Sequence, residues 1–145
     1  RHKYKKTEIV FISHSVDAHE VSEDDFFKKG SAGGTIMSSG IEKCMEIISK
    51  RYHRDSWNIY SFHCSDGDNW PEDNDKSISL SLSLKEMCQM YCYVQTTSPE
   101  SASFWNEGGM ANVYSKISDS KFKIVELESP DDIWREFKRI FGGKV

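Results

Sequence analysis

The chain has 145 residues and a mass of 16.7 kDa, close to the commonest size of a single domain. Charged residues form 29% and aromatic residues 12% of the sequence, which excludes disordered and fibrous proteins. The net charge of −4 favours neither nucleic acid nor an anionic membrane as a partner, and the longest aliphatic or aromatic run, Ile9–Ile12, is too short to cross a bilayer.

Apolar runs and amphipathic stretches alternate along the chain and predict elements in the order β-α-β-α-β-α-β-α. The predicted strands are 7–14, 57–64, 91–97 and 122–127, and the predicted helices are 35–52, 77–91, 109–117 and 130–141. The polar segment 16–34 is predicted as a long loop, or as a loop with a short insertion. We expect the first strand to be covered on both faces, because its apolar residues are consecutive.

Two of these helices depend on particular features. Residues 77–84 alternate between serine and apolar residues as a strand would, yet Leu80, Leu84 and Cys88 also share one side of a helix. We choose the helix, because the parallel strand that follows requires a crossover. In the last helix, Ser129 is the predicted N-cap and Pro130 the first helical residue. Its predicted buried face consists of Ile133, Trp134, Phe137, Ile140 and Phe141.

This order predicts an α/β fold of three layers, a mainly parallel sheet with helices on both faces, in one domain over residues 1–145. The chain begins at Arg1 without a methionine, and we interpret it as truncated at the N-terminus. The four predicted strands would then omit the central strand, and the uncovered edges would promote pairing between chains. No secretory signal is visible, and the four cysteines form no C-x-x-C pair, so we expect buried thiols in a reducing cytoplasm.

Two polar loops follow the first and second predicted strands. The first ends at Thr35 and carries His19 and Glu20, and the second reads Ser-Asp-Gly-Asp-Asn-Trp over residues 65–70. Parallel strands end on the same edge of a sheet, where ligands bind, and carboxylate and hydroxyl oxygens suit Mg²⁺. The alternative is an ordinary Asp-Gly turn with Thr35 as an N-cap. His14 and His63, near strand ends, are either ligands or acid–base groups, or ordinary buried histidines.

Several segments of the chain resemble the YhbH/YeaH-like family of bacterial stress-response and sporulation proteins. They are Phe11–His14, Glu20–Glu23 with Phe26-Phe27, Gly33–Thr35, Trp57–Tyr60, Ser65–Trp70, and Asp131–Trp134 with Phe137 and Phe141. The family is similar to von Willebrand factor A domains, which have a Rossmann-type sheet. The resemblance therefore implies such a domain lacking its first strand and helix.

Von Willebrand A domains bind a divalent metal through an Asp-x-Ser-x-Ser segment, a distant threonine and a later aspartate. The resemblance places the threonine at Thr35 and the aspartate at Asp66, with Asp68 beside it, while the Asp-x-Ser-x-Ser segment is absent here. It implies a non-catalytic interaction module that holds Mg²⁺ or another divalent cation in the intact protein. By family context, the protein partners would include a serine protein kinase and a second sporulation protein. His14, His19, Glu20, Asn69 and Trp70 are the further candidates for the binding edge.

A different class of function is an Mg²⁺-dependent phosphoryl-transfer or hydrolase domain. Asp66 and Asp68 would then divide the roles of metal ligand and nucleophile or base. Such a site needs a cation to hold phosphate, and the candidates are Lys28, Lys29 and Lys76, none at a defined spacing. No phosphate-binding glycine motif and no nucleophile elbow accompanies them.

Overall fold

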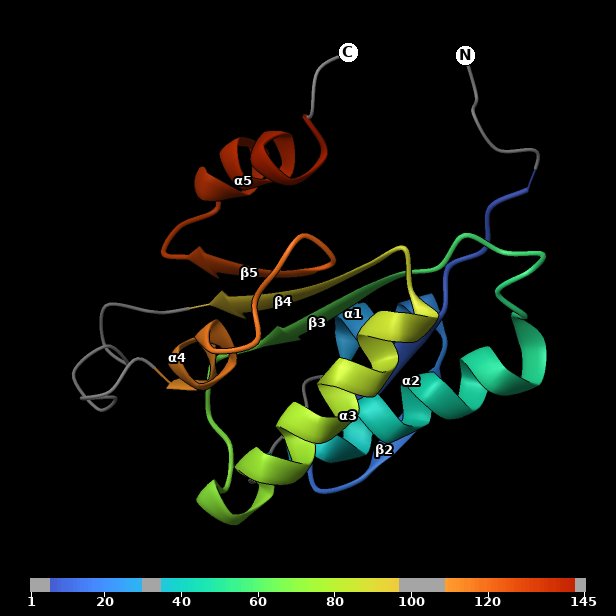
Figure 1. The fold of residues 1–145 in the computed structure, drawn as a ribbon, viewed down its shortest axis with the longest axis horizontal. Helices are drawn as coiled ribbons and strands as arrows, with labels where there is room; N and C mark the ends of the chain where they lie inside the picture. Colours follow the sequence, from blue (N-terminus) through green and yellow to red (C-terminus); the bar gives the residue numbers. More distant parts are fainter. Residues whose placement is uncertain (1–5, 30–34, 97–108, 143–145) are drawn as a thin grey trace.

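The computed structural model describes residues 6–29, 35–96 and 109–142 and contains two sheets (Figure 1). Strands β3 (Tyr60–Ser65), β4 (Met90–Thr96) and β5 (Phe122–Leu127) form a parallel sheet in the order β3-β4-β5. Strands β1 (Phe11–His14) and β2 (Ala18–Val21) form a separate antiparallel hairpin. The result is a mixed α/β fold whose parallel sheet has helices on both faces.

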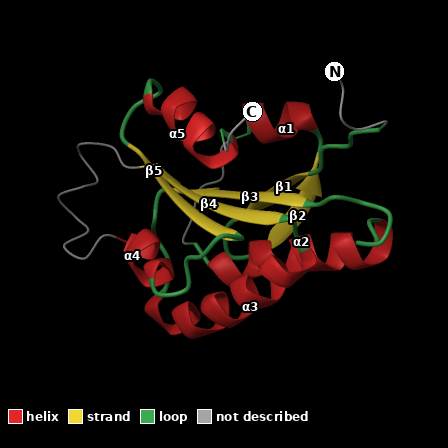
Figure 2. Ribbon diagram, turned by 45° about the horizontal axis from the view of Figure 1, so that its top comes forward, coloured by secondary structure: helices red, strands yellow, loops and turns green. Residues whose placement is uncertain are grey.

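Five helices surround these sheets in the described part of the chain. They are α1 (Glu23–Lys28), α2 (Met37–Arg51), α3 (Asn74–Met87), α4 (Gly109–Ser115) and α5 (Asp132–Phe141), and a short 3₁₀ turn (Pro71–Asp73) precedes α3. Helices α2, α3 and α4 lie on one side of the parallel sheet, and α1 and α5 lie on the other (Figure 2). Among the described residues, no helix is both long and apolar enough to cross a membrane.

The main core lies between the parallel sheet and helices α2, α3 and α4. Residues of alternating position on β4 and β5 face these helices, as the period of a strand requires. Tyr91, Tyr93, Tyr114 and Phe122 are fully buried there, and their rings form a chain of contacts with centroids 4.7–5.4 Å apart. A smaller cluster of Met90, Cys92 and Val125 lies on the other face, beneath Ile140 of α5.

The N-terminal third differs from its prediction. The expected strand 7–14 is shortened to β1, and β1 pairs antiparallel with β2 instead of joining the parallel sheet. The segment predicted as a loop holds both β2 and α1, whose N-cap Ser22 accepts a hydrogen bond from the amide of Asp25. Ile9 is 74% exposed, so the expectation of a strand covered on both faces was wrong.

The prediction for the last helix was also wrong in two respects. Helix α5 begins at Asp132, and its N-cap residue is Asp131 instead of Ser129. The carboxylate of Asp132 accepts hydrogen bonds from the amides of Glu128 and Ser129. None of the residues of α5 is buried, although its apolar residues share one side as predicted. Among the cysteines, Cys88 and Cys92 are buried, but Cys64 is exposed.

The other elements agree with the sequence. β5 has the predicted bounds, and residues 74–87 are helical, which confirms the choice of a crossover helix over a strand. Met37, Ile41 and Ile48 form the predicted buried side of α2. The glycine-rich residues 30–34 and the loop predicted at Ser98-Pro99 lie outside the described residues.

Candidate metal-binding edge

The loop after β3 meets the beginnings of two helices at the edge where the parallel strands end. The amide of Trp70 donates to the carbonyl of Thr35 at 3.4 Å, and the amide of Met110 in α4 donates to the carbonyl of Gly67 at 3.1 Å. The amide of Ile36 donates to the carbonyl of Ser15, in the turn of the β1–β2 hairpin. Thr35 and the Asp66–Trp70 loop are thus brought together, as the sequence predicts.

The Asp66–Trp70 loop is shaped by local hydrogen bonds and one glycine. Ser65 Oγ accepts from the amide of Gly67 at 3.0 Å, and Asp66 Oδ1 accepts from the amide of Asp68 at 3.1 Å. Gly67 has a φ of +94°, and a Cβ there would lie 2.6 Å from Cδ of Gln95. The turn therefore requires glycine, for its backbone conformation and for its close approach to a buried side chain.

Gln95 supports this loop from below. It is 2% exposed at the end of β4, and its Oε1 accepts from the amide of Ala111 in α4 at 2.8 Å. Gly67 and Gly109 both pack against it. One buried amide thus fixes the relative positions of the Asp66 turn and the start of α4.

Helix α2 receives its N-terminal caps from a distant part of the chain. Its N-cap residue is Ile36, which has no side-chain hydrogen bond to offer. Instead, Asn69 Oδ1 accepts from the amide of Met37 at 2.9 Å, and Asp73 Oδ2 accepts from the amide of Ser38 at 3.0 Å. The caps provided by Asn69 and Asp73 join the start of α2, beside Thr35, to the loop after β3. Thr35 itself is not the N-cap of α2.

Asp73 is a buried carboxylate that the sequence did not identify. Besides the amide of Ser38, it accepts a hydrogen bond from Ser77 Oγ at 2.7 Å. Burial acts to raise the pKa of Asp73, but the hydrogen bonds from Ser38 and Ser77 outweigh it and hold the pKa below its ordinary value. The charge also faces the positive end of the α2 dipole, so it stabilises this junction.

His14 and His63 form a buried pair behind the loop. Their Nε2 atoms lie 3.0 Å apart, and His63 Nδ1 lies 2.9 Å from the hydroxyl of Tyr91. Burial, together with the neighbouring His14, lowers the pKa of His63 to about 3. Burial also lowers the pKa of His14, against the opposing charge of Asp66. The pair is therefore neutral at pH 7, with one Nε2 donating to the other.

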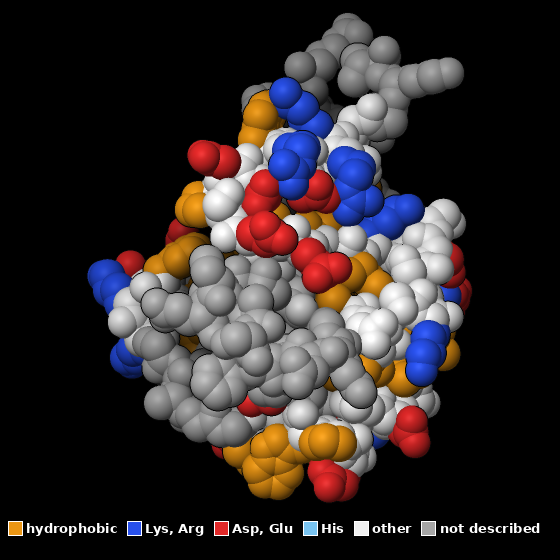
Figure 3. Space-filling view, turned by 90° about the vertical axis from the view of Figure 1, so that its left-hand side faces the viewer, with side chains coloured by type: hydrophobic (Ala, Val, Ile, Leu, Met, Phe, Trp, Pro, Cys, Tyr) orange, Lys and Arg blue, Asp and Glu red, His pale blue; other side chains and the backbone are white. Residues whose placement is uncertain are grey.

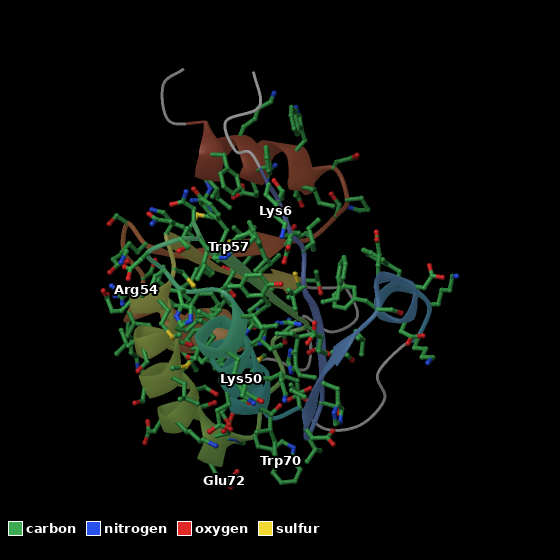
Figure 4. All side chains as sticks on the ribbon, turned by 90° about the vertical axis from the view of Figure 1, so that its right-hand side faces the viewer. Lys6, Lys50, Arg54, Trp57, Trp70 and Glu72 are labelled. Atoms are coloured by element: carbon green, nitrogen blue, oxygen red, sulfur yellow. The ribbon has the colours of Figure 1, made fainter. Side chains whose placement is uncertain are left out.

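Two of the remaining candidates, His19 and Glu20, lie away from the Asp66–Trp70 loop, whereas Trp70 belongs to it. His19 lies 3.0 Å from Asp17 on the exposed hairpin. Glu20 forms an ion pair with Arg51 at the C-terminal end of α2, about 22 Å along that helix from its start. Trp70 is 52% exposed, and it projects with Glu72 from the same end of the molecule (Figure 4).

The side chains at this edge offer oxygen atoms of the type that a hard cation prefers. Thr35, Asp66 and Asp68 offer hydroxyl and carboxylate oxygens, which Mg²⁺ prefers. Over residues 6–29, 35–96 and 109–142, however, no group of three or more His, Cys, Asp or Glu could hold a metal ion. The described surface on this side carries side chains of both charges (Figure 3).

The lysines considered for phosphate binding are paired elsewhere. Lys28 and Lys29 form ion pairs with Asp24 and Asp25 within and just after α1, and Lys76 on α3 pairs with Glu42 on α2. Such exposed pairs are weak, but they place these ammonium groups on helix surfaces. Nothing in their arrangement favours a phosphoryl-transfer site around Asp66.

The fold and this edge define a mixed α/β protein with a polar loop cluster at the ends of its parallel strands. The chain belongs to the DUF444 family, described as a protein of unknown function, whose profile matches residues 1–144. It is 40% identical over 142 residues to a UPF0229 protein of Ruminiclostridium cellulolyticum and 37% identical over 141 residues to one of Halalkalibacterium halodurans. A UPF0229 protein of Clostridium perfringens is 35% identical over 145 residues.

These relatives are much longer than the chain. The matches cover 97% of the chain for the first two relatives and 100% for the third, but only 35–36% of each relative. No solved structure matches the chain. The family is therefore bacterial and of unknown function, and the chain spans about a third of the length of these relatives.

Proposed function

We propose that the chain forms part of a metal-dependent protein-interaction module of von Willebrand A type. In this proposal, Thr35 and Asp66, with Asp68 beside it, contribute oxygen ligands to Mg²⁺ or another divalent cation. An Asp-x-Ser-x-Ser segment that this sequence lacks provides the other ligands. A carboxylate of a partner protein completes the coordination, and the domain carries out no reaction of its own.

The observation that carries the proposal is the capping of α2 by two residues from the loop after β3. Asn69 and Asp73 bind the amides of Met37 and Ser38, so the start of α2 and the Asp66 turn are held as one unit. That unit presents a threonine and an exposed aspartate at the ligand-binding edge of a parallel sheet. A site that recruits a partner's carboxylate to a cation needs such an open, oxygen-rich edge.

The family resemblance extends this proposal to the cell. It supports a bacterial stress-response or sporulation role of the YhbH/YeaH type in the cytoplasm. Its protein partners would be a serine protein kinase and a second sporulation protein. These assignments rest on resemblance alone.

The metal site is tested on the whole UPF0229 protein of Ruminiclostridium cellulolyticum, which contains the region outside the match. Calorimetric titration with Mn²⁺ and Mg²⁺ should show one site, and the protein with the residue aligned to Asp66 changed to asparagine should bind at least about tenfold more weakly. The matched control changes the residue aligned to the exposed Glu72 to glutamine and should bind as the unaltered protein does. Equal binding by all three forms, or none by any, contradicts the proposal.

The enzymatic alternative is separated from it by an activity assay. A phosphatase assay of the same whole protein, unaltered and with the residues aligned to Asp66 and Asp68 each changed to asparagine, should show no turnover in any form. Turnover that either substitution abolishes would favour a hydrolase and would refute the binding module.

A further inference from the structure

A line of buried polar side chains crosses the main core, between the parallel sheet and helices α2, α3 and α4 (Figure 2). At one end, His14 of β1 and His63 of β3 meet through their Nε2 atoms, which lie 3.0 Å apart. His63 Nδ1 lies 2.9 Å from the hydroxyl of Tyr91 on β4. At the other end, Ser77 Oγ of α3 donates to the carboxylate of Asp73 at 2.7 Å. Tyr91 and Ser77 are both fully buried, so each end continues into the core as a hydroxyl.

Two further hydroxyls lie between these ends. Ser81 is one helical turn beyond Ser77 on α3, Tyr114 belongs to α4, and both residues are fully buried. Among the described residues, neither Ser81 Oγ nor Tyr114 Oη has a hydrogen-bond partner. Burial raises the pKa of Tyr114 to about 12, and the nearby hydroxyls of Ser81 and Ser77 oppose this rise. Burial also raises the pKa of Tyr91, and Ser81 again opposes it.

The four hydroxyls are therefore neighbours in the order Tyr91, Ser81, Tyr114, Ser77. Buried hydroxyls without a partner are rare, because each one carries the full penalty of its lost bond to water. A hydroxyl hydrogen rotates about its C–O bond to reach a neighbouring oxygen. Small rotations of these four groups join the two ends of the line without any other residue.

The charge of Asp73 gives this line a direction. An ionised carboxylate can only accept hydrogen bonds, so the single hydroxyl hydrogen of Ser77 is directed at Asp73. The oxygen of Ser77 is then left to accept from Tyr114. Because every hydroxyl has one hydrogen, the same count repeats at each position, and each group donates towards Asp73.

The histidine end fits the same direction. His63 then donates from Nδ1 to the oxygen of Tyr91, and its Nε2 accepts from Nε2 of His14. His14 Nδ1 carries no hydrogen in this arrangement, and it is a buried atom without a partner among the described residues. In the opposite direction this atom would be a buried N–H without an acceptor, which native proteins rarely leave.

We propose that seven side chains form one hydrogen-bond relay, directed towards Asp73, that couples the loop after β3 to the β1–β2 hairpin. The relay consists of His14, His63, Tyr91, Ser81, Tyr114, Ser77 and Asp73.

The two directions of the relay are its two states, and the charge of Asp73 selects one of them. Asp73 also caps α2 through the amide of Ser38, so movement of this loop draws the carboxylate away from Ser77 and allows the reverse direction. On reversal, each histidine loses the hydrogen on one ring nitrogen and gains one on the other, and its charge does not change. This inference does not rest on the proposed function, because neither metal nor partner takes part in the relay.

The tautomers are measured by NMR of the imidazole nitrogens in the ¹⁵N-labelled 145-residue chain, at pH 7 in EDTA. His63 should be mainly in the Nδ1–H form and His14 in the Nε2–H form. Tyr114→Phe removes one hydroxyl and interrupts the relay, and it should raise the Nε2–H fraction of His63 at least about threefold. Ser81→Ala interrupts the relay at the next position and should have the same effect.

Tyr93→Phe is the matched control and should leave the tautomer of His63 unchanged. Tyr93 is a fully buried tyrosine of β4, but its hydroxyl lies 3.4 Å from Gln95 Oε1 and is not part of the relay. A mainly Nε2–H form of His63 in the unaltered chain would overturn the inference, because the relay would run the other way. An Nε2–H fraction that Tyr114→Phe or Ser81→Ala leaves as low as Tyr93→Phe does would also overturn it. The unaltered chain decides the direction, and either interrupting variant that folds decides the coupling.

Discussion

The two faces of the parallel sheet use similar aromatic residues with opposite results. Towards α2, α3 and α4, Tyr91, Tyr93 and Phe122 are fully buried. Towards α5, Phe62 and Trp134 remain more than half exposed. At about 25 cal/mol per Å² of buried apolar surface, the first face supplies most of the hydrophobic stabilisation. The chain therefore buries the aromatic residues on the face towards α2, α3 and α4, and it leaves those on the face towards α5 partly exposed.

The largest expected difference between the faces comes from truncating one phenylalanine on each. Phe122→Ala should lower the free energy of unfolding by about 3–5 kcal/mol, because it leaves a cavity in a packed core. Phe62→Ala should lower it by less than about 1 kcal/mol, because half of that ring already faces water. Urea denaturation measures both. Equal losses would show that Phe62 is as tightly packed as Phe122.

Acidification should destabilise the folded chain through the buried histidine pair. The pKa of His63 is about 3 in the folded chain and near 6.5 in the unfolded chain, so the unfolded state binds more protons as the pH falls below 6.5. Each histidine of the pair that stays neutral in the folded chain then lowers the free energy of unfolding by up to about 1.4 kcal/mol per pH unit. The stability is fully present above pH 6.5 and is lost towards pH 3, and His14 acts in the same direction.

Urea denaturation between pH 6.5 and pH 5 measures this slope, in a range where carboxylates remain ionised. His63→Gln should reduce the slope by about one proton. A slope that survives His63→Gln would place the linkage elsewhere.

The capping of α2 by Asp73 predicts a smaller but specific loss of stability. Asp73→Ala removes the acceptor for the Ser38 amide and the Ser77 hydroxyl, and should cost about 1.5–3 kcal/mol. Asp75→Ala, at an exposed position on α3, should change stability by less than about 0.5 kcal/mol. Thermal unfolding followed by circular dichroism compares the two. If they match, Asp73 does not hold α2 to the loop after β3.

The smallest effect on stability is expected on α5. Trp134→Ser should change the free energy of unfolding by less than about 0.5 kcal/mol, because the ring is 62% exposed. It should nevertheless reduce the binding of an apolar dye such as anilinonaphthalene sulfonate, since it removes one end of the aromatic surface. Unchanged dye fluorescence would mean that the dye reports another part of the molecule.

Local patterns predicted much of the fold. The apolar run of β5 and the periodic side of α2 are properties of neighbouring residues, so the sequence shows them directly. β2 was missed because its residues, Ala-His-Glu-Val, are too polar and too few to stand out. The apolar side of α5 was recognised, but periodicity shows which side is apolar and not whether anything covers it.

The candidate edge was predicted in outline. Thr35 does contact the Asp66–Trp70 loop, through the hydrogen bond from the amide of Trp70 to its carbonyl. The rule used to predict this, that parallel strands end on one edge, does not explain it, because β1 lies outside the parallel sheet. Gln95 and Asp73 were missed, because their roles depend on contacts across 16 and 35 residues of sequence. One signal was available: Ile36 cannot cap a helix, so the start of α2 needed an acceptor from elsewhere.

Residue-resolved amide exchange of the 145-residue chain, measured by NMR, tests the contrast between the two regions most directly. β4 is paired on both sides, so its amides should exchange only through global unfolding. Among the described residues, the amides of β3 that do not bond to β4 and those of β1 that do not bond to β2 should exchange at least about a hundredfold faster. Exchange of β3 as slow as that of β4 would contradict the account, because it would show that the edge is already paired.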